Sequence, residues 1–269
     1  MPIWIALVLG AVEGLTEFLP VSSTGHLVLA SRALGLTDAT ASTFDVVVQA
    51  GALVAVIVHY RALLGRHILG LVHREPATMR LVAALLAGFM PAAILGVLAR
   101  KAIKAFLFKP LPVALALFVG GVVMIVVDRW ARRRTEAPID RLEDVTPVHG
   151  LWIGLAQCAS LWPGTSRAMS TIVGGQLCGL STATAAEFSF LLAIPVLTAA
   201  TMLDAAKDGA ALVATREAQL ALLVGLLTSF LVAWAVIATF LRFLRARGLA
   251  PFGWYRMLVA VAVLVWMRR

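Results

Sequence analysis

The chain has 269 residues, of which 61% are hydrophobic and 14% charged, and its mean hydropathy is +0.94. This composition excludes a soluble globular domain and indicates an integral membrane protein. The formal net charge of +9 is interpreted as membrane topology, because Lys and Arg gather in cytoplasmic loops, and no nucleic-acid partner is expected.

The first apolar region, residues 3–36, is interrupted at its centre by "LPVSSTGH". Each half is shorter than the roughly 20 residues that a helix needs to cross a bilayer. Non-helical backbone at membrane depth is tolerated only where it lines protein or a water-filled cavity. The region is therefore predicted to form a re-entrant helical hairpin beside a buried polar site. Three transmembrane helices are expected to follow, near residues 45–60, 81–98 and 111–127.

The second half of the chain repeats this order. Residues 148–180 are interrupted by "WPGTSRAMST", which predicts a second re-entrant hairpin. Three further spans are expected near residues 186–204, 217–241 and 251–267. The predicted fold class is an all-α integral membrane protein with six transmembrane helices and two re-entrant helical hairpins.

The two hairpin regions also resemble each other in sequence. An offset of 144 residues pairs Glu13 with Gln157, and an offset of 143 pairs Ser23 with Ser166. The drift by one residue suggests a duplicated unit with a small deletion. Three spans between the hairpins are an odd number, so the two repeats are expected to have inverted topology, as in secondary transporters.

The whole chain, residues 1–269, is expected to be a single membrane domain. Repeat one covers about residues 1–127 and repeat two about 148–269, joined by a cytoplasmic loop at about 128–147. Arginines cluster in that loop, in residues 60–80 and after residue 241, which favours both termini outside. The basic run at residues 100–109 goes against this topology, and it is either an interfacial helix or the flank of a span.

The first break carries candidate catalytic groups. Glu13 and Glu17 are four residues apart, so a helix places both carboxylates on one face, where a divalent cation could compensate their charge. Beyond them Ser22, Ser23, Thr24 and His26 lie at the break, where the next helix is expected to begin. A helix N-terminus with hydroxyl donors is a natural phosphate site.

The second break offers a fixed cation. Arg167 follows Ser166 and precedes Ser170 and Thr171, and a guanidinium group is well shaped to bind phosphate oxygens. The plainer interpretation of Ser170 and of Thr24 is a hydrogen bond back to the residue's own helix.

These two segments resemble a known family. "EGLTEFLPVSSTGH" and "PGTSRAMST" are similar to the two signature segments of the bacterial undecaprenyl-diphosphate phosphatases of the bacitracin-resistance type. The second segment departs from the family pattern at Ala168, where a Ser is usual. The resemblance implies hydrolysis of a C55 isoprenoid diphosphate to the monophosphate carrier of cell-wall precursors, dependence on Mg²⁺ or Ca²⁺, and resistance to bacitracin.

The same resemblance implies a multi-pass protein of the bacterial cytoplasmic (inner) membrane, surrounded by membrane lipids, whose site opens to the periplasmic or outer side. The sequence leaves the oligomeric state open, a homodimer included. It also leaves open a carrier or flippase for isoprenyl phosphates, which would use the same phosphate-binding residues without hydrolysis.

The residues suggest roles for hydrolysis. Ser23 is the candidate nucleophile, with His26 as acid or base, Arg167 as the phosphate clamp, and Glu13 and Glu17 as metal ligands. A water molecule activated by Glu17 or His26 is the alternative nucleophile. Hydroxyl groups near the nucleophile and the clamp are expected to bind substrate, namely those of Ser22, Thr24, Ser166 and Thr171.

Overall fold

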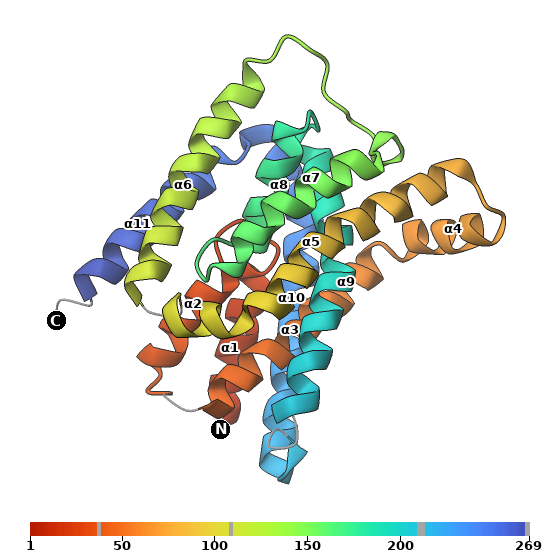
Figure 1. Cartoon of the computed structure of the whole chain (residues 1–269). Coiled ribbons are helices and arrows are strands. Elements are labelled where there is room, and N and C mark those ends of the chain that lie inside the picture. The colour runs from red at the N-terminus through yellow and green to blue at the C-terminus, as the bar shows by residue number, and fades with distance from the viewer. Residues whose placement is uncertain (37–38, 108–109, 209–212, 267–269) are drawn as a thin grey trace. The chain divides into compact units, whose positions relative to one another are not determined.

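A computed structural model describes residues 1–36, 39–107, 110–208 and 213–266. These residues form eleven α-helices and two short 3₁₀ turns, and no β-strand is present among them (Figure 1). The helices are α1 (Ile3–Thr16), α2 (Ser23–Ala33), α3 (Ala39–His59), α4 (Arg61–Val72), α5 (Pro76–Phe106), α6 (Pro110–Arg132), α7 (Pro147–Gln157), α8 (Arg167–Leu177), α9 (Thr182–Asp208), α10 (Arg216–Arg247) and α11 (Ala250–Trp266). The 3₁₀ turns are η1 (Leu142–Asp144) and η2 (Cys158–Leu161).

Several helices are long and apolar enough to cross a bilayer. Four qualify singly, and α3 with α4 qualifies as a pair bent by 71°. The four single spans are Pro76–Ala99, Leu111–Arg132, Thr182–Ala206 and Arg216–Arg247. The predicted last span, 251–267, coincides with the shorter apolar helix α11, and its final residue lies outside the described part of the chain. The all-helical, multi-pass class is thus confirmed, with four or five candidate spans.

Both predicted breaks are present. A turn at residues 17–22 separates α1 from α2, and η2 followed by a turn separates α7 from α8. One prediction was wrong for most of its length: residues 60–80, interpreted as a loop because of their arginines, contain α4 at residues 61–72 and the start of α5 at Pro76. Apolar residues outnumber the charged ones in this segment, so it continues as helix after the bend beyond His59.

The basic run at residues 100–109 lies only partly within the described residues. Its backbone up to residue 106 is the last part of the long helix α5, which argues for the flank of a span. Lys109 falls outside the described residues.

The chain divides into two compact units. The first unit comprises Met1–Leu19, Ser23–Arg61 and Ala193–Thr239, and the second comprises Pro20–Ser22, Ala62–Leu192 and Phe240–Arg269. Each unit therefore draws on both sequence repeats.

Small residues set the helix packing inside the second unit. Figure 1 shows α6 and α11 side by side. A Cβ atom added to Gly121 would lie 2.6 Å from the carbonyl oxygen of Gly253, and one added to Gly253 would lie 2.7 Å from that of Gly121. Helices that approach so closely need glycine at the crossing. In the same way α7 packs on α5, with Gly150 against Ala84.

The first unit uses the same device to hold α1. A Cβ atom on Gly10 or Gly14 would lie 2.5 Å from the carbonyl oxygen of Gly225 or Ser229 on α10. An apolar cluster packs around this contact and positions the helix that carries the two glutamates. It comprises Ile5, Ala6, Leu9, Leu27, Phe44, Val48 and Ala221.

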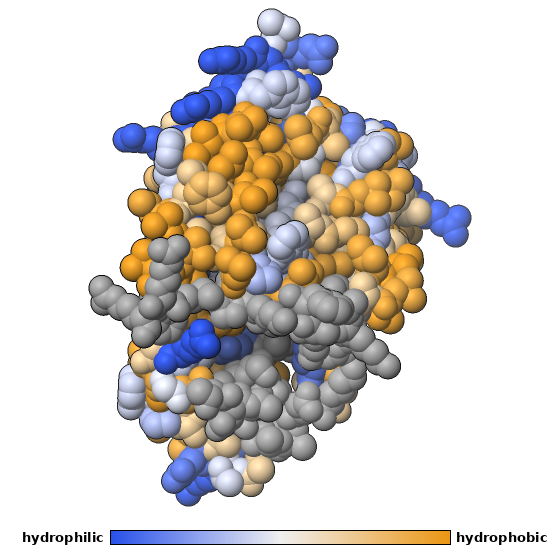
Figure 2. Space-filling model, turned by 60° about the vertical axis from the view of Figure 1, so that its left-hand side comes forward, coloured by the Kyte–Doolittle hydropathy of each residue, from blue (hydrophilic) through white to orange (hydrophobic). Residues whose placement is uncertain are grey.

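The outer surface suits a lipid environment. Large apolar side chains such as Leu98, Val72 and Leu258 are 70% or more exposed, and Figure 2 shows apolar side chains over much of the described surface in its view. In water such a surface would favour aggregation, whereas lipid tails are themselves apolar. The surface therefore agrees with the membrane class inferred from composition.

We expect Gly121→Ala to lower the free energy of unfolding by about 1–3 kcal/mol, because the new methyl group meets main-chain atoms of α11 that cannot move independently. Reversible unfolding in detergent micelles measures the change. Gly65→Ala on α4 is the matched control: its Cβ meets nothing within 4 Å, so it is expected to be neutral or slightly stabilising. Equal effects of the two substitutions would contradict the packing role of Gly121.

Candidate active site

The first break brings a serine hydroxyl to a buried carboxylate. Glu13 and Glu17 lie near the end of α1 and are 1% and 7% exposed. Ser23, the first residue of α2, donates a hydrogen bond from Oγ to Glu17 Oε2 over 2.5 Å. A hydroxyl bound this closely to a carboxylate can lose its proton to it as it attacks an electrophile. The predicted nucleophile is therefore beside a predicted base.

The other residues of this break surround the start of α2. Ser22 is buried, Thr24 is exposed, and the side chain of His26 is partly buried one helical turn after Ser23. The N–H groups in the first turn of a helix have no partner within that helix, so this turn can accept an anion.

The second break fixes Arg167 at the start of α8. Its Nη1 donates to the carbonyl oxygen of Ser189 over 2.9 Å and lies 3.3 Å from the Ser189 hydroxyl. Ser189 is completely buried on α9, and Thr171 donates to its hydroxyl over 2.7 Å. Ser189 thus orients the guanidinium, with Thr171 behind it.

Sequence reasoning missed Ser189. A lone serine in an apolar span usually bonds its own helix, so nothing local distinguished it. Thr171, a predicted substrate ligand, is itself completely buried. The structure shows Thr171 supporting Ser189, and its contact with substrate stays a prediction.

The remaining hydroxyls of α8 act locally. Ser166 caps the helix, its Oγ accepting from the N–H of Met169 over 3.3 Å. Ser170 donates back to the Ser166 carbonyl oxygen over 3.0 Å, which confirms the plainer interpretation of that residue. Ala168 is completely buried, so a serine hydroxyl at this position would need a partner inside the protein.

The backbone corrects the predicted pairing of the repeats. Ser22 and Ser166 have positive φ angles of 74° and 75°, which non-glycine residues rarely adopt. The helices after them begin at Ser23 and Arg167. The offset is therefore 144 at the break as well, and the pairing of Ser23 with Ser166 was wrong by one residue. Ser23 and Arg167 occupy equivalent positions.

The residues present fit a divalent cation. Glu13 and Glu17 are buried carboxylates one turn apart, and oxygen atoms are the ligands of Mg²⁺ and Ca²⁺. The described residues contain no group of three or more His, Cys, Asp or Glu side chains placed to hold a metal. A pair of carboxylates, as in Glu13 and Glu17, suits Mg²⁺ in particular. This ion commonly takes one or two carboxylates and completes its coordination shell with water and phosphate oxygens.

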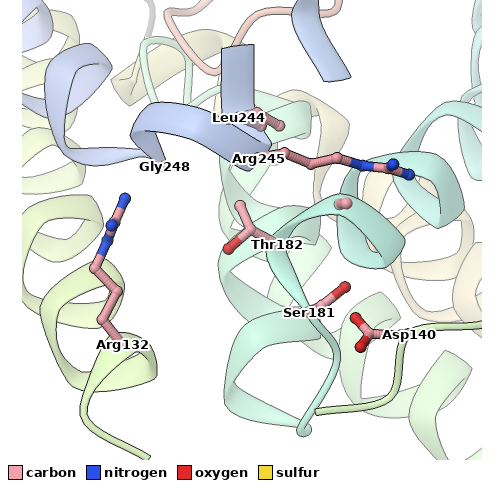
Figure 3. A pocket seen from close by; sticks show the side chains of 8 residues that line it. Arg132, Asp140, Ser181, Thr182, Leu244, Arg245 and Gly248 are labelled. Carbon is pink, nitrogen blue, oxygen red and sulfur yellow. The ribbon is translucent and has the colours of Figure 1, made fainter. Parts of the chain in front are cut away.

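A cavity of about 530 Å³ lies elsewhere in the second unit (Figure 3). It is lined by Arg132, Asp140, Ser181, Thr182, Ala183, Leu244, Arg245 and Gly248. None of the predicted site residues is in this lining. Arg132 is bound to Asp128 and Arg245 lies 3.6 Å from Glu187, so both cations of the cavity already have acidic neighbours.

The apolar helices and the two polar breaks define the class as a helical multi-pass membrane protein. Within this class, the family model of bacitracin resistance protein BacA matches residues 6–262. The chain therefore belongs to the BacA family.

Named relatives cover nearly the whole chain. The undecaprenyl-diphosphatase of Sorangium cellulosum is 57% identical over 259 residues, which are 96% of this chain and 84% of that protein. The undecaprenyl-diphosphatase of Acidovorax ebreus is 44% identical over 262 residues, 97% of this chain and 93% of that protein. That of Rhizorhabdus wittichii is 42% identical over 261 residues, 97% and 96% of the two chains.

We expect Ser189→Ala to weaken the affinity for inorganic pyrophosphate about 3- to 10-fold, because Arg167 keeps its bond to the main chain but loses the hydroxyl. Calorimetric titration of the purified protein measures this affinity. Ser229→Ala is the matched control: Ser229 is also completely buried, and its hydroxyl has no hydrogen-bond partner among the described residues. If both variants bind pyrophosphate as the parent does, Ser189 does not orient the clamp.

Proposed function

We propose that the protein hydrolyses undecaprenyl diphosphate to undecaprenyl phosphate and inorganic phosphate, and so confers resistance to bacitracin. The family and the names of its relatives support this activity. The observation that carries the chemistry is the 2.5 Å hydrogen bond from Ser23 Oγ to Glu17 Oε2. A carrier without hydrolysis is not favoured, because binding alone gives no use to a serine held against a base.

In the first step, Ser23 Oγ attacks the terminal phosphorus while its proton passes to Glu17. The bond from that phosphorus to the bridging oxygen breaks, and undecaprenyl phosphate leaves with the electron pair. Water then hydrolyses the phosphoserine, with His26 as the group that moves its proton. In the alternative version a water molecule, activated by Glu17 or His26, attacks directly.

Charge neutralisation has two proposed sources. Arg167 binds the diphosphate oxygens, assisted by Ser22, Thr24, Ser166 and main-chain donors of the helix starts. Glu13 and Glu17 would hold a Mg²⁺ or Ca²⁺ ion, which would supply positive charge to neutralise the diphosphate. Positioning and neutralisation of this kind supply most of the catalysis in phosphoryl transfer.

The finer arrangement is part of the same proposal. Six spans and two re-entrant hairpins form two inverted repeats in the bacterial inner membrane, with the site open to the outer side. The equal offset of 144 at the starts of α1 and α7, and of α2 and α8, supports a duplicated hairpin.

The activity is tested with the purified protein in detergent and undecaprenyl diphosphate as substrate. We expect release of inorganic phosphate, its loss in EDTA and its return with added Mg²⁺ or Ca²⁺, because the two carboxylates need a cation between them and the substrate. Substrate binding without phosphate release would favour the carrier. Release that persists in EDTA would remove the metal from the proposal.

Ser23→Ala should lower kcat at least about 100-fold, because it removes the attacking oxygen. Rapid acid quenching followed by mass spectrometry should detect phosphoserine at position 23 in the parent. Ser170→Ala is the control, since that hydroxyl donates to the carbonyl oxygen of Ser166 at the start of its own helix and its loss should change kcat little. Near-parental activity of Ser23→Ala would instead support direct attack by water.

A further inference from the structure

A buried arginine outside the predicted site binds both breaks. Arg256 on α11 is completely buried, and each of its five N–H groups donates to a main-chain carbonyl oxygen. The acceptors are Leu117 at 3.3 Å from Nε, Pro20 at 3.1 Å and Thr165 at 2.8 Å from Nη1, and Ala116 at 3.1 Å and Gly164 at 2.8 Å from Nη2. All of these residues belong to the second unit.

The chemistry of this contact is unusual for a buried cation. Burying a guanidinium costs several kcal/mol unless its donors are satisfied, and the usual partner is a carboxylate. Here all five donors go to neutral carbonyl groups instead. The guanidinium is therefore held by the dipoles of carbonyl groups, three of them in the breaks and two on α6, and these bonds include no carboxylate that would cancel its charge.

The acceptors follow the repeat. Pro20 and Gly164 are 144 residues apart, the same offset that relates Ser22 to Ser166. One guanidinium thus joins equivalent carbonyl groups of the two repeats. Pro20 lies two residues before Ser22, and Gly164 lies two residues before Ser166. These two serines end the breaks and have positive φ angles.

Binding the carbonyls also orients the neighbouring N–H groups. The described residues contain no cis peptide bond, and in a trans peptide the C=O and N–H point in opposite directions. The N–H groups of Val21 and Ser166 therefore point away from Arg256. A cation at the carbonyl oxygen also polarises the peptide, which makes its N–H a stronger donor.

We propose that Arg256 is a positioning residue that fixes the two breaks relative to each other and turns the N–H groups of Val21 and Ser166 toward the diphosphate. This inference rests on the proposed function. In this proposal, two main-chain N–H groups bind the diphosphate together with Arg167. The side chain of Arg256 holds these N–H groups in the orientation that binding requires.

Gly120 leaves the space that the guanidinium of Arg256 occupies. A Cβ atom at this position would meet Nη2 of Arg256. Gly120→Ala therefore displaces the guanidinium while leaving the arginine and both breaks unchanged in sequence.

The test compares Arg256→Lys and Gly120→Ala with the parent, using phosphate release from undecaprenyl diphosphate and its inhibition by inorganic pyrophosphate. A lysine has three donors on one atom and cannot bridge five carbonyls. We expect a kcat at least about 10-fold lower and an inhibition constant for pyrophosphate at least about 5-fold higher in both variants. Partial unfolding would lower the rate alone, because the molecules still folded keep their affinity.

Arg134→Lys and Gly65→Ala are the matched controls. Arg134 also donates to a main-chain carbonyl, that of Gln176 over 3.2 Å, but at the opposite end of α8. Both controls should keep the parental inhibition constant. If Gly120→Ala folds and keeps that constant, or if Arg256→Lys lowers kcat alone, Arg256 has no positioning role. Absence of phosphate release from the parent itself would instead overturn the proposed function.

Discussion

A backbone that leaves the helix inside a protein must find other partners for its carbonyl groups, and this constraint governs both breaks of the chain. Arg256 meets it with a single side chain, whose five donors bind carbonyls from α6 and from the two breaks. Because α11 carries this residue, a helix near the end of the sequence binds the break of the first hairpin at Pro20. The serines that follow, Ser22 and Ser166, can hold a rare positive φ only in such a fixed setting.

The repeat explains how one hairpin sequence came to supply two kinds of chemistry. At the offset of 144, Ser23 and Arg167 are equivalent first residues of α2 and α8. One became a hydroxyl beside a carboxylate and the other a cation held by Ser189. Glu13 and Gln157 differ in the same way, and within the two hairpin segments, residues 3–36 and 148–180, acids occur in the first only. The two helix starts are thus alike in backbone and different in the chemistry of their first side chain.

Much of this could be predicted from sequence because the signals are local. Apolar length identified helices at all six expected spans, and proline, glycine and hydroxyl residues marked both breaks. The predicted alignment of the two repeats was wrong by one residue at the break. Pro20 and Pro163 look equivalent in sequence, whereas the backbone pairs Pro20 with Gly164. Ser189 and Arg256 were missed because their partners lie far away in the chain and are partly or wholly main-chain atoms, which every sequence contains.

The packing of α1 has a consequence for biosynthesis. Gly10 and Gly14 fit against Gly225 and Ser229 of α10, so one neighbour of the helix that carries the glutamates lies more than 200 residues later in the sequence, while α2 and α3 contact the same helix from nearby. By contrast α7 packs on α5, which is already made when α7 emerges. The packing of α1 can therefore be completed only after α10 has been made. A chain that ended before α10 would leave the Gly10 and Gly14 face of α1 without this close-fitting helix.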